Sequence, residues 1–427
     1  MKKNKIIIKK LINELWPLNR SITGKGFLKS LKIIKSHIKT LKIKKVKSAT
    51  KVYDWNIPKE WEVTEAWVKD SDGHEIINYK KNNLHLVGYS CPINKKISFN
   101  EFNKHLFSLR SQPKAIPYVT SYYKKDWGFC VAYKDRKKFL KNKKYHVFIN
   151  SKFKKGFLRY GEVLVPGKLK KEIFISTYLC HPSLANNELS GPILATLIVN
   201  WLKQKKRYYS YRIIFIPETI GSITYISKNL EYLKSNMIAG FNLTCVGDEG
   251  NFSYLPSRNE NTAADKIIKD TLKKNKIRFK KYNWTDRGSD ERQYCSPGVD
   301  LPVASLMRSK YGTYKEYHTS LDQFGTVVTS KGLLQSLTIY KKIFIEIEKN
   351  YYPKAINKCE PFLSKKNLYP SLSIKNSLNK KTVQISNILT YSDGSISAKD
   401  ISKKINTSYN VVLKHLSLLK KNKLVSY

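Results

Sequence analysis

The spacing of apolar side chains changes along the chain and divides it into segments with different expected structures. In the first 50 residues, apolar positions recur at helical intervals, as at Ile7, Leu11 and Leu15, and this spacing predicts amphipathic helices. From residue 52 to residue 168, short runs of alternating apolar and polar residues are bounded by clusters of Asn, Pro, Gly and Lys. Alternation of this kind predicts a β-rich segment.

Residues 169–350 show a different pattern, in which apolar runs of strand length take turns with longer helical repeats. Strands are expected at 172–179, 212–217, 240–246 and 301–306, and helices at 192–205, 223–234, 263–275 and 331–349. Ser190 is expected to be the N-cap of the first of these helices. Such an alternation is typical of an α/β fold whose parallel or mixed sheet is covered by helices on both faces.

The C-terminal part of the chain has its own organisation. Residues 351–380 contain Pro, Ser, Lys and Tyr without a regular repeat and are expected to form a linker. Residues 381–427 show three helical repeats, with Ser397 as a good N-cap of the second, and resemble a winged-helix domain of the helix-turn-helix type. The expected domains are then a discontinuous α/β domain (1–51 and 169–350), an inserted β-rich domain (52–168), the linker and the winged helix.

The chain is strongly basic, with 80 Lys and Arg residues against 32 Asp and Glu residues and a formal net charge of +48. A charge of this size suggests a nucleic-acid partner at first sight. However, only 11 of the basic residues are Arg, the side chain that phosphate and base recognition favours, and the Lys residues are scattered. The winged-helix segment is hardly more basic than the rest. We therefore interpret the charge as a solvated Lys surface, and nucleic acid as an open but not favoured partner.

Two further features concern the compartment. The six Cys residues lie far apart without a CxxC pair, which is typical of reduced thiols in a chain of this length. The apolar stretch after the basic N-terminus ends at Lys9, and the longest later run, residues 193–202, is too short to span a bilayer. We expect a cytoplasmic protein without a membrane span, and the sequence leaves open whether it forms a homo-oligomer.

Polar, chemically capable side chains follow the expected strands of the α/β region. Three of these strands lead directly into His181, Glu218 and Asp248. Ligands of open α/β sheets bind beyond the carboxyl ends of the strands. These side chains are therefore expected to converge if their strands are neighbours.

Two loops further along the chain carry more candidates, Asp290 and Glu291 in one and Tyr317 and His318 in the other. Two histidines with several carboxylates form a ligand set that zinc prefers, and a catalytic zinc keeps an open position beside a Glu that accepts a proton. Each residue also has a structural alternative. His181 can be a satisfied buried histidine, and Asp290 and Glu291 can pair with the flanking arginines.

Several stretches carry motifs of a known enzyme class. Those that look like degenerate forms of co-catalytic zinc aminopeptidase motifs are residues 181–191, 217–222, 289–294 and 317–322. Those that resemble, more closely, a bacterial family described as aminopeptidase-like are residues 16–26, 161–167, 242–248 and 287–291. The resemblance covers nearly the whole chain. It implies an α/β fold with a mixed, mostly parallel sheet of the zinc-aminopeptidase type, an inserted β-rich domain, a C-terminal winged helix and an association with polysaccharide biosynthesis.

Carried over residue by residue, the resemblance makes His181 the first metal ligand, His318 the last, and Glu218 the general base. Three positions that the aminopeptidase pattern gives to carboxylates are neutral in this chain: Asn187, Thr219 and Thr244. Neutral side chains cannot offset two dications at close separation, so the two-metal site is expected to be lost. Glu188 and Asp248 are expected to complete, with both histidines, a site for one zinc ion, and a second ion stays open.

The function expected from these residues is hydrolysis of a peptide or amide bond, with zinc as cofactor and a peptide or an amide-containing small molecule as substrate. Glu218 would accept a proton from water and pass it to the leaving amine. Glu291 is grouped with the catalytic residues, and Asp290 and Tyr317 with the substrate-binding ones. Two alternatives stay open. The neutral motif positions favour a degenerate protein that binds a peptide or a sugar-linked amide, and the winged helix favours a DNA-binding regulator.

Overall fold

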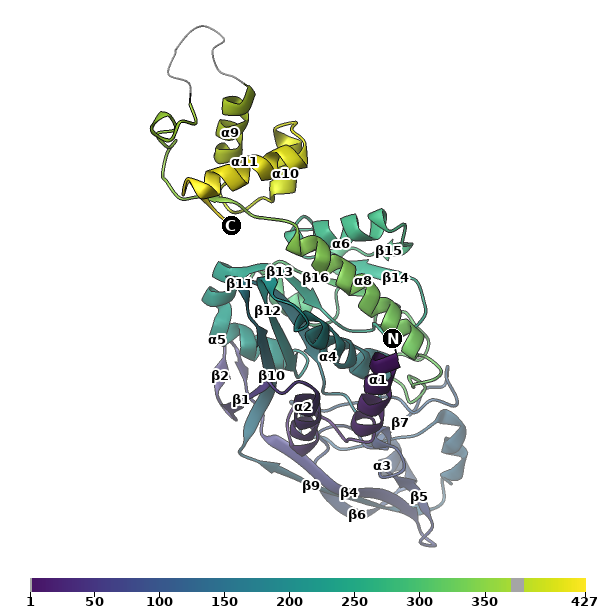
Figure 1. The fold of residues 1–427 in the computed structure, drawn as a ribbon. Coiled ribbons are helices and arrows are strands. Elements are labelled where there is room, and N and C mark those ends of the chain that lie inside the picture. Colours follow the sequence, from purple (N-terminus) through teal and green to yellow (C-terminus); the bar gives the residue numbers. More distant parts are fainter. Residues whose placement is uncertain (1, 370–379) are drawn as a thin grey trace. The chain divides into compact units, whose positions relative to one another are not determined.

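The computed structural model describes residues 2–369 and 380–427 (Figure 1). The chain divides into two compact units, residues 1–341 and residues 342–427. The linker predicted at 351–380 extends over residues 370–379, which lie outside the described part of the chain.

Among the described residues of the larger unit, eight strands form one mixed sheet. In spatial order they are β1 (Lys42–Lys47), β10 (Phe157–Val165), β12 (Arg207–Ile216), β11 (Gly167–Tyr178), β13 (Met237–Asn242), β16 (Val303–Met307), β14 (Phe252–Leu255) and β15 (Phe279–Lys281). The central strands β12, β11, β13 and β16 run parallel, whereas β1, β10 and β14 each pair antiparallel with a neighbour. All four strands predicted within 169–350 are present, and the sheet is mixed with a parallel centre.

Helices cover both faces of this sheet (Figure 1). They are α1 (Lys2–Leu15), α2 (Lys25–His37), α4 (Ser190–Leu202), α5 (Ile220–Asn236), α6 (Ala263–Lys274), α7 (Glu291–Tyr294) and α8 (Ser330–Glu348). The central strand β11 is buried from Glu172 to Tyr178, because α4 and α5 both pack against it. A parallel strand that is buried on both faces needs apolar residues at successive positions, and Ile173, Phe174 and Ile175 supply them.

A second sheet lies within the segment that the sequence predicts as the β-rich insertion. Its described strands, in spatial order, are β5 (Glu75–Asn78), β4 (Glu60–Asp70), β9 (Lys144–Lys154) and β6 (Ile93–Ser98). Shorter elements of the segment are β2 (Lys51–Val52), β3 (Trp55–Asn56), η1 (Asn83–His85), α3 (Phe99–Asn103), β7 (Leu106–Phe107), β8 (Phe129–Cys130) and η2 (Tyr133–Lys138). The segment is rich in strands as expected, but β10 pairs with β1 and β12 in the large sheet, and β1 is a strand where the sequence predicts helix.

In its described residues, the smaller unit contains α9 (Lys380–Thr390), α10 (Ala398–Lys404), α11 (Tyr409–Lys421) and the antiparallel pair β17 (Lys354–Ala355) and β18 (Val425–Ser426). Each helix contributes to one apolar core, through Ile385, Ile401 and Leu416. Ser397 caps α10 as predicted, because its Oγ accepts a hydrogen bond of 3.1 Å from the backbone N–H of Asp400. Since β17 pairs with β18, the unit includes residues before the predicted start at 381.

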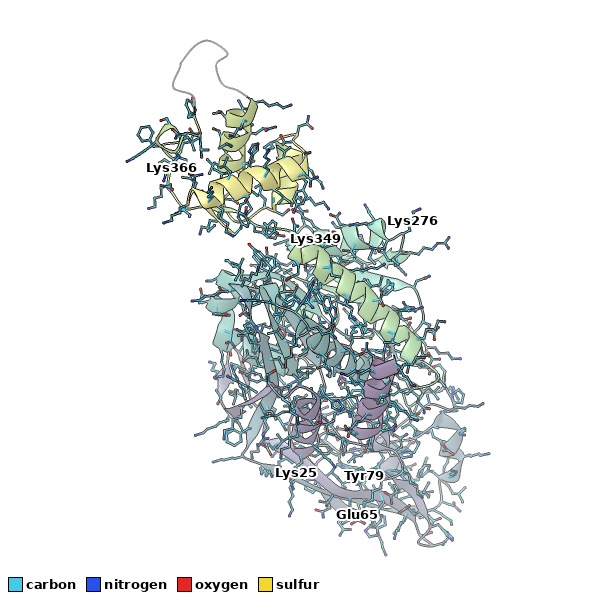
Figure 2. The ribbon with its side chains drawn as sticks, viewed as in Figure 1. Lys25, Glu65, Tyr79, Lys276, Lys349 and Lys366 are labelled. Atoms are coloured by element: carbon cyan, nitrogen blue, oxygen red, sulfur yellow. The ribbon has the colours of Figure 1, made fainter. Side chains whose placement is uncertain are left out.

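Lysine side chains extend into solvent from both units. The labelled Lys25 and Lys276 belong to the larger unit, and Lys349 and Lys366 belong to the smaller one (Figure 2). This spread agrees with a solvated Lys surface. Within residues 2–369 and 380–427, the helices are all too short or too polar to cross a lipid bilayer.

Candidate active site

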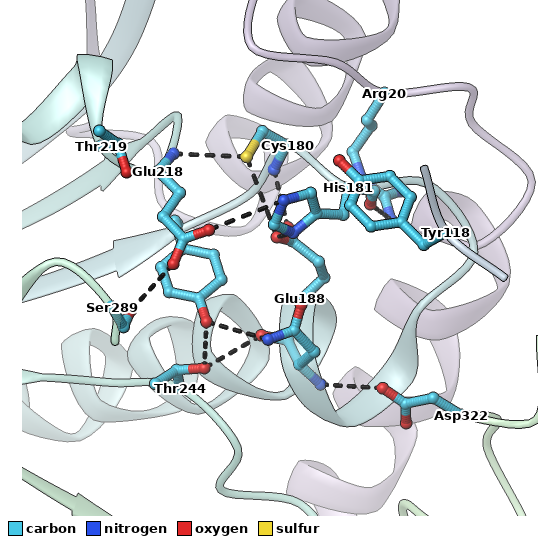
Figure 3. Close-up of polar contacts among 12 residues, drawn as sticks. Arg20, Tyr118, Cys180, His181, Glu188, Glu218, Thr219, Thr244, Ser289 and Asp322 are labelled. Carbon is cyan, nitrogen blue, oxygen red and sulfur yellow. Dashed lines mark hydrogen bonds and ion pairs between the residues drawn. The ribbon is translucent and has the colours of Figure 1, made fainter. Parts of the chain in front are cut away.

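His181 and Glu218 follow two neighbouring strands and meet at one edge of the large sheet. Strands β11 and β12 pair in parallel as far as Tyr178 and Ile216, so the segments that follow leave the sheet side by side. His181 Nε2 lies 3.7 Å from Glu218 Oε2 (Figure 3). The convergence that the strand ends predict is therefore present for this pair.

Glu188 approaches the same imidazole at its other nitrogen. A π-helical turn, η3 (Ala185–Leu189), runs directly into α4 and carries Glu188. Glu188 Oε1 contacts His181 Nδ1, and Oε2 accepts a hydrogen bond of 2.7 Å from the backbone N–H of Cys180. The buried side chains of Cys180, His181 and Glu188 each offer one possible metal-ligand atom, and these three atoms lie within 4.8 Å of one another. Because η3 continues into α4, the predicted N-cap role of Ser190 is wrong, and its Oγ donates to a carbonyl of the turn instead.

His318, from the loop before α8, is the second imidazole of the site. The centroids of the His318 and His181 rings are 5.5 Å apart. His318 Nε2 is buried and has no hydrogen-bond partner among the described residues. Burial, together with the nearby His181, lowers the pKa of His318 to about 3, so its ring is neutral. A buried, neutral imidazole nitrogen without a partner is the kind of donor that a metal ion takes up.

Two tyrosines flank the histidine pair. The ring of Tyr118, from the segment between β7 and β8, lies edge-on to His181, with 4.5 Å between the ring centroids (Figure 3). It also lies edge-on to His318, at a centroid distance of 5.3 Å. Its backbone N–H donates to the carbonyl of His318 at 2.9 Å. Tyr317, which the sequence places at the substrate, stacks on His318 with ring centroids 3.9 Å apart. Sequence reasoning missed Tyr118, which counted only as part of an alternating run.

A buried arginine fixes the backbone of His181. Arg20 Nε and Nη2 both donate to the His181 carbonyl, at 3.1 Å and 2.8 Å, and Nη1 donates to the carbonyl of Leu15 at 2.5 Å. Burial lowers the pKa of Arg20 to about 10, which leaves the guanidinium protonated at neutral pH. Arg20 lies in the stretch 16–26 that carries the family resemblance, and this contact ties that distant segment to the site.

The motif positions that lack a carboxylate are joined by a neutral hydrogen-bond network. Tyr178 Oη lies 2.6 Å from Thr244 Oγ1 and accepts a hydrogen bond of 3.1 Å from Asn187 Nδ2 (Figure 3). Thr244 Oγ1 donates to the backbone carbonyl of Asn187 at 3.1 Å. Since these side chains carry no charge, the network supplies nothing to offset a second dication.

Glu218 stands in a half-buried turn between β12 and α5. Ser289 Oγ donates to Glu218 Oε1 at 3.1 Å. The next residue, Thr219, has a left-handed backbone with φ 62°, and its N–H donates to Asp290 Oδ1 at 2.7 Å. Burial raises the pKa of Glu218, although the nearby His181 opposes this shift. A carboxylate with a raised pKa is suited both to accept a proton and to return it.

Asp290 and Glu291 hold the polypeptide around this turn. Asp290 is fully buried, and burial raises its pKa well above the usual range. Glu291 Oε1 accepts hydrogen bonds from two backbone N–H groups of the preceding loop and contacts Tyr311 Oη, and Oε2 accepts one of 2.9 Å from Asn242 Nδ2. No described contact supports the catalytic role predicted for Glu291, and the full burial of Asp290 gives no support to its predicted substrate-binding role.

Asp248 forms no described hydrogen bond or ion pair with either histidine, and its contacts lie elsewhere. Its Oδ2 accepts hydrogen bonds from Asn186 Nδ2 at 2.9 Å and from the backbone N–H of Ser309 at 3.0 Å. Its Oδ1 accepts hydrogen bonds from Ser309 Oγ at 2.9 Å and from the N–H of Gly250 at 2.8 Å. Both carboxylate oxygens are therefore engaged by the loops that follow β13 and β16. This geometry gives no support to the metal-ligand role predicted for Asp248. Of the other predicted ligands, Glu188 contacts His181, and the ring of His318 lies near the ring of His181.

Comparison with known proteins places these features in a family. Residues 9–350 match the family described as "Domain of unknown function (DUF4910)", and residues 350–427 match "winged helix-turn-helix". A protein of Clostridium acetobutylicum named "Putative polysaccharide biosynthesis protein with aminopeptidase-like domain" is 42% identical over 397 residues. The match covers 92% of this chain and 90% of that protein.

Solved structures agree with this match. The crystal structure of a "putative peptidase" from Clostridium acetobutylicum has a TM-score of 0.80 at 38% identity, over 100% of this chain and 96% of that one. BSAP, a zinc aminopeptidase from Bacillus subtilis, has a TM-score of 0.57 at 13% identity, over 81% of this chain and 95% of that one. At this identity the second match shows the fold alone. The predicted fold class, the aminopeptidase-like resemblance and the winged helix are confirmed.

Proposed function

Because this chain belongs to the DUF4910 family and its larger unit has the fold of zinc aminopeptidases, we propose that it is a zinc-dependent hydrolase of a peptide or amide bond. The observation that carries this proposal is the placement of His181 beside Glu218, with 3.7 Å between His181 Nε2 and Glu218 Oε2. A histidine that can bind metal and a half-buried carboxylate that can move a proton are the two groups such hydrolysis needs.

We assign the zinc site to His181, His318 and Glu188. The donors fit the ion, because two imidazoles and one carboxylate form a ligand set of catalytic zinc, and His318 Nε2 is buried with no partner among the described residues. When bound, zinc polarises the substrate carbonyl and lowers the pKa of a water molecule. The neutral network around Tyr178 and Thr244 favours one ion over two.

Glu218 is the general base in this proposal. Its carboxylate takes a proton from the attacking water and returns it to the leaving amine, so that protons balance over the reaction. The hydrogen bond from Ser289 engages Oε1 and leaves Oε2 on the side of His181. Burial raises the pKa of Glu218. The carboxyl group therefore retains more readily the proton taken from water until it is passed to the leaving amine.

The substrate in this proposal contains an amide or peptide bond and a sugar. The relative in Clostridium acetobutylicum carries polysaccharide biosynthesis in its name, and we extend that role to this chain as part of the proposal. Tyr118 and Tyr317 flank the two imidazoles and would contact the substrate next to the bond that is cleaved.

Hydrolysis of a panel of aminoacyl-arylamides and N-acyl amino sugars by the zinc-loaded full chain tests the proposal. We expect Glu218→Gln to lower kcat by at least about 100-fold, because it removes the base while keeping the shape of the side chain. Glu231→Gln, an exposed position on the helix that follows Glu218, is the matched control and should leave the rate unchanged. Hydrolysis that Glu218→Gln leaves intact would rule out the assigned base.

A second candidate function, ligand binding without turnover, is favoured by the neutral network at the lost carboxylate positions. Under this alternative the site around His181 and His318 binds a peptide or a sugar-linked amide, and the two histidines contact the ligand without catalysing its cleavage. Full-length protein reconstituted with zinc would then bind such an amide but never cleave it. Cellular function would also survive Glu218→Gln.

The winged helix adds DNA as a separate candidate partner. Helix α11 carries Lys414, Lys420 and Lys421, all of them exposed. Binding that keeps a sequence preference in the presence of competitor DNA, with a steep dependence on salt, would support a regulatory role. Binding without any sequence preference would report only the Lys-rich surface.

A further inference from the structure

A polar cavity lies where four segments that are distant in sequence meet. Its volume is about 640 Å³, and its walls come from the end of α1, the turn before η1, the loop after His181 and the loop after His318. Asn83 ties three of these segments together, because its Nδ2 donates to Ser183 Oγ at 3.0 Å and to the carbonyl of Pro17 at 3.3 Å. The cavity is thus a built feature of the larger unit.

The cavity shares two of its walls with the histidine pair. Ser183 and Ser320 line it, and each stands two residues after one of the histidines. Ser320 Oγ accepts a hydrogen bond of 3.0 Å from the backbone N–H of Ile116. The segment that brings Tyr118 to the histidines therefore also fixes this wall. The cavity is therefore built in part from the same two loops that carry the histidines.

The lining has the composition of a sugar-binding site. Trp16 and Phe324 supply aromatic surface, with ring centroids 6.0 Å apart and ring planes at 74°. Carboxamide side chains line the cavity as well, from Asn13, Asn82, Asn83 and Gln323. The apolar face of a sugar ring packs on an aromatic ring, and its hydroxyl groups need both donors and acceptors, which a carboxamide supplies from one side chain.

The same lining favours an acidic group. Lys80 and Lys81 line the cavity, and no Asp or Glu is among its described lining residues. Lys81 pairs with Glu75 at 3.0 Å, but both side chains are partly or fully exposed, and an exposed ion pair is weak enough for a ligand carboxylate to compete.

We propose that this cavity binds an acidic sugar unit of the substrate, a hexuronate in chemical class. Trp16 packs on the sugar ring, the carboxamides take the hydroxyl groups, and Lys80 and Lys81 face the carboxylate. The assignment to the substrate rests on the proposed amide hydrolysis, whereas binding of the sugar needs no catalysis. The stretch 16–26 then contributes to both sites, because Arg20 holds the backbone of His181 and Trp16 lines the cavity.

Titration calorimetry of the full chain with tri-galacturonate tests this assignment. We expect binding that weakens by at least about tenfold, or 1.4 kcal/mol, when the carboxylates of the trisaccharide are reduced to alcohols. Trp16→Ala and the double variant Lys80→Ala/Lys81→Ala should each weaken binding of tri-galacturonate by at least about tenfold. The matched control is Lys95→Ala/Lys96→Ala, an exposed pair on β6 outside the cavity, which should leave the affinity unchanged.

Three results would overturn the assignment. The wild type does not bind tri-galacturonate, the Lys80/Lys81 and Lys95/Lys96 double variants lose affinity equally, or Trp16→Ala leaves the affinity unchanged. Trp16→Phe keeps a ring and should retain most of the affinity, and melting curves of all variants separate a lost contact from a lost fold. Glu218→Gln should bind the trisaccharide as wild type does. Binding of the trisaccharide without hydrolysis of any substrate would contradict the proposed hydrolase and support the proposed sugar site. Hydrolysis without binding of the trisaccharide would support the hydrolase and contradict the sugar site.

Discussion

The ring of Tyr118 lies edge-on to the imidazole of His181, with 4.5 Å between the ring centroids. Tyr118 comes from the β-rich segment, whereas His181 follows the central strand β11 of the large sheet. An antiparallel bridge between Pro117 and Thr319 joins the Tyr118 segment to the loop that carries His318, the second imidazole of the site. The β-rich segment is thus a wall of the site.

Removal of the Tyr118 ring should impair turnover without removing the metal. We expect Tyr118→Ala to lower kcat/KM by about tenfold, because the substrate loses a surface that positions it, and to leave the zinc content unchanged. Tyr118→Phe keeps the ring and loses only the 2.7 Å hydrogen bond to Tyr122 Oη, so it should stay close to wild type. Steady-state kinetics check both, and an equal loss in the two variants would point to the hydroxyl group instead.

Glu188→Gln tests whether Glu188 is a ligand. Gln keeps the size of the side chain and an acceptor for the Cys180 N–H, but it removes the charge that would face zinc. We expect zinc affinity, measured by competition with a chelator, to fall by more than about 100-fold. A variant that keeps its zinc and only turns over more slowly would show that Glu188 instead orients His181 through Nδ1.

Arg20 should matter for both stability and the site, because its guanidinium holds the carbonyls of Leu15 and His181. Lys cannot reproduce this planar fork, so Arg20→Lys is expected to lower the free energy of unfolding of the larger unit by about 3 kcal/mol. Denaturant titration measures this loss. Arg278→Lys, at an exposed position, is the matched control, and equal stabilities of the two variants would contradict the role of Arg20.

Asp322 predicts a pH dependence of stability. It accepts hydrogen bonds from the N–H groups of Asn186 and Asn187 at 2.8 Å and 3.1 Å. Burial raises the pKa of Asp322 from 3.8 to about 6, so the folded state keeps its proton to a higher pH than the unfolded state does. Its contribution therefore favours folding below about pH 4 and is lost as the pH rises to about 6.

The comparison with Asp322→Asn isolates this contribution. Between about pH 4 and pH 7, the free energy of unfolding of the wild type should fall by about 2 kcal/mol relative to that of the variant. Denaturant titrations at the two pH values measure the difference. A difference that does not change with pH would contradict the raised pKa.

The meeting of His181 and Glu218 could be predicted, because residues at the ends of adjacent parallel strands share one edge of the sheet. The same reasoning does not hold for Asp248. It follows β13 by several residues, and a turn closed by Gly250 and Ser309 engages both of its oxygens. Position after a strand indicates the edge at which a residue lies, but the turn decides where its side chain points.

Tyr118 and Arg20 could not be predicted from spacing. Their contacts join segments far apart in sequence, through a backbone bridge in one case and two hydrogen bonds to the His181 carbonyl in the other. Neither contact leaves a periodic pattern in the chain. The N-cap role of Ser190 is wrong for a local reason, since a π-helical turn precedes α4 and continues into it.

The zinc content of the purified full chain, measured by elemental analysis after exposure to zinc and removal of the free ion, tests the central claim most directly. The wild type should hold about one zinc ion per chain, and His181→Ala and His318→Ala should each lose it together with hydrolysis. A wild type that holds no zinc, and hydrolyses its substrate at a rate that neither substitution changes, would contradict the account.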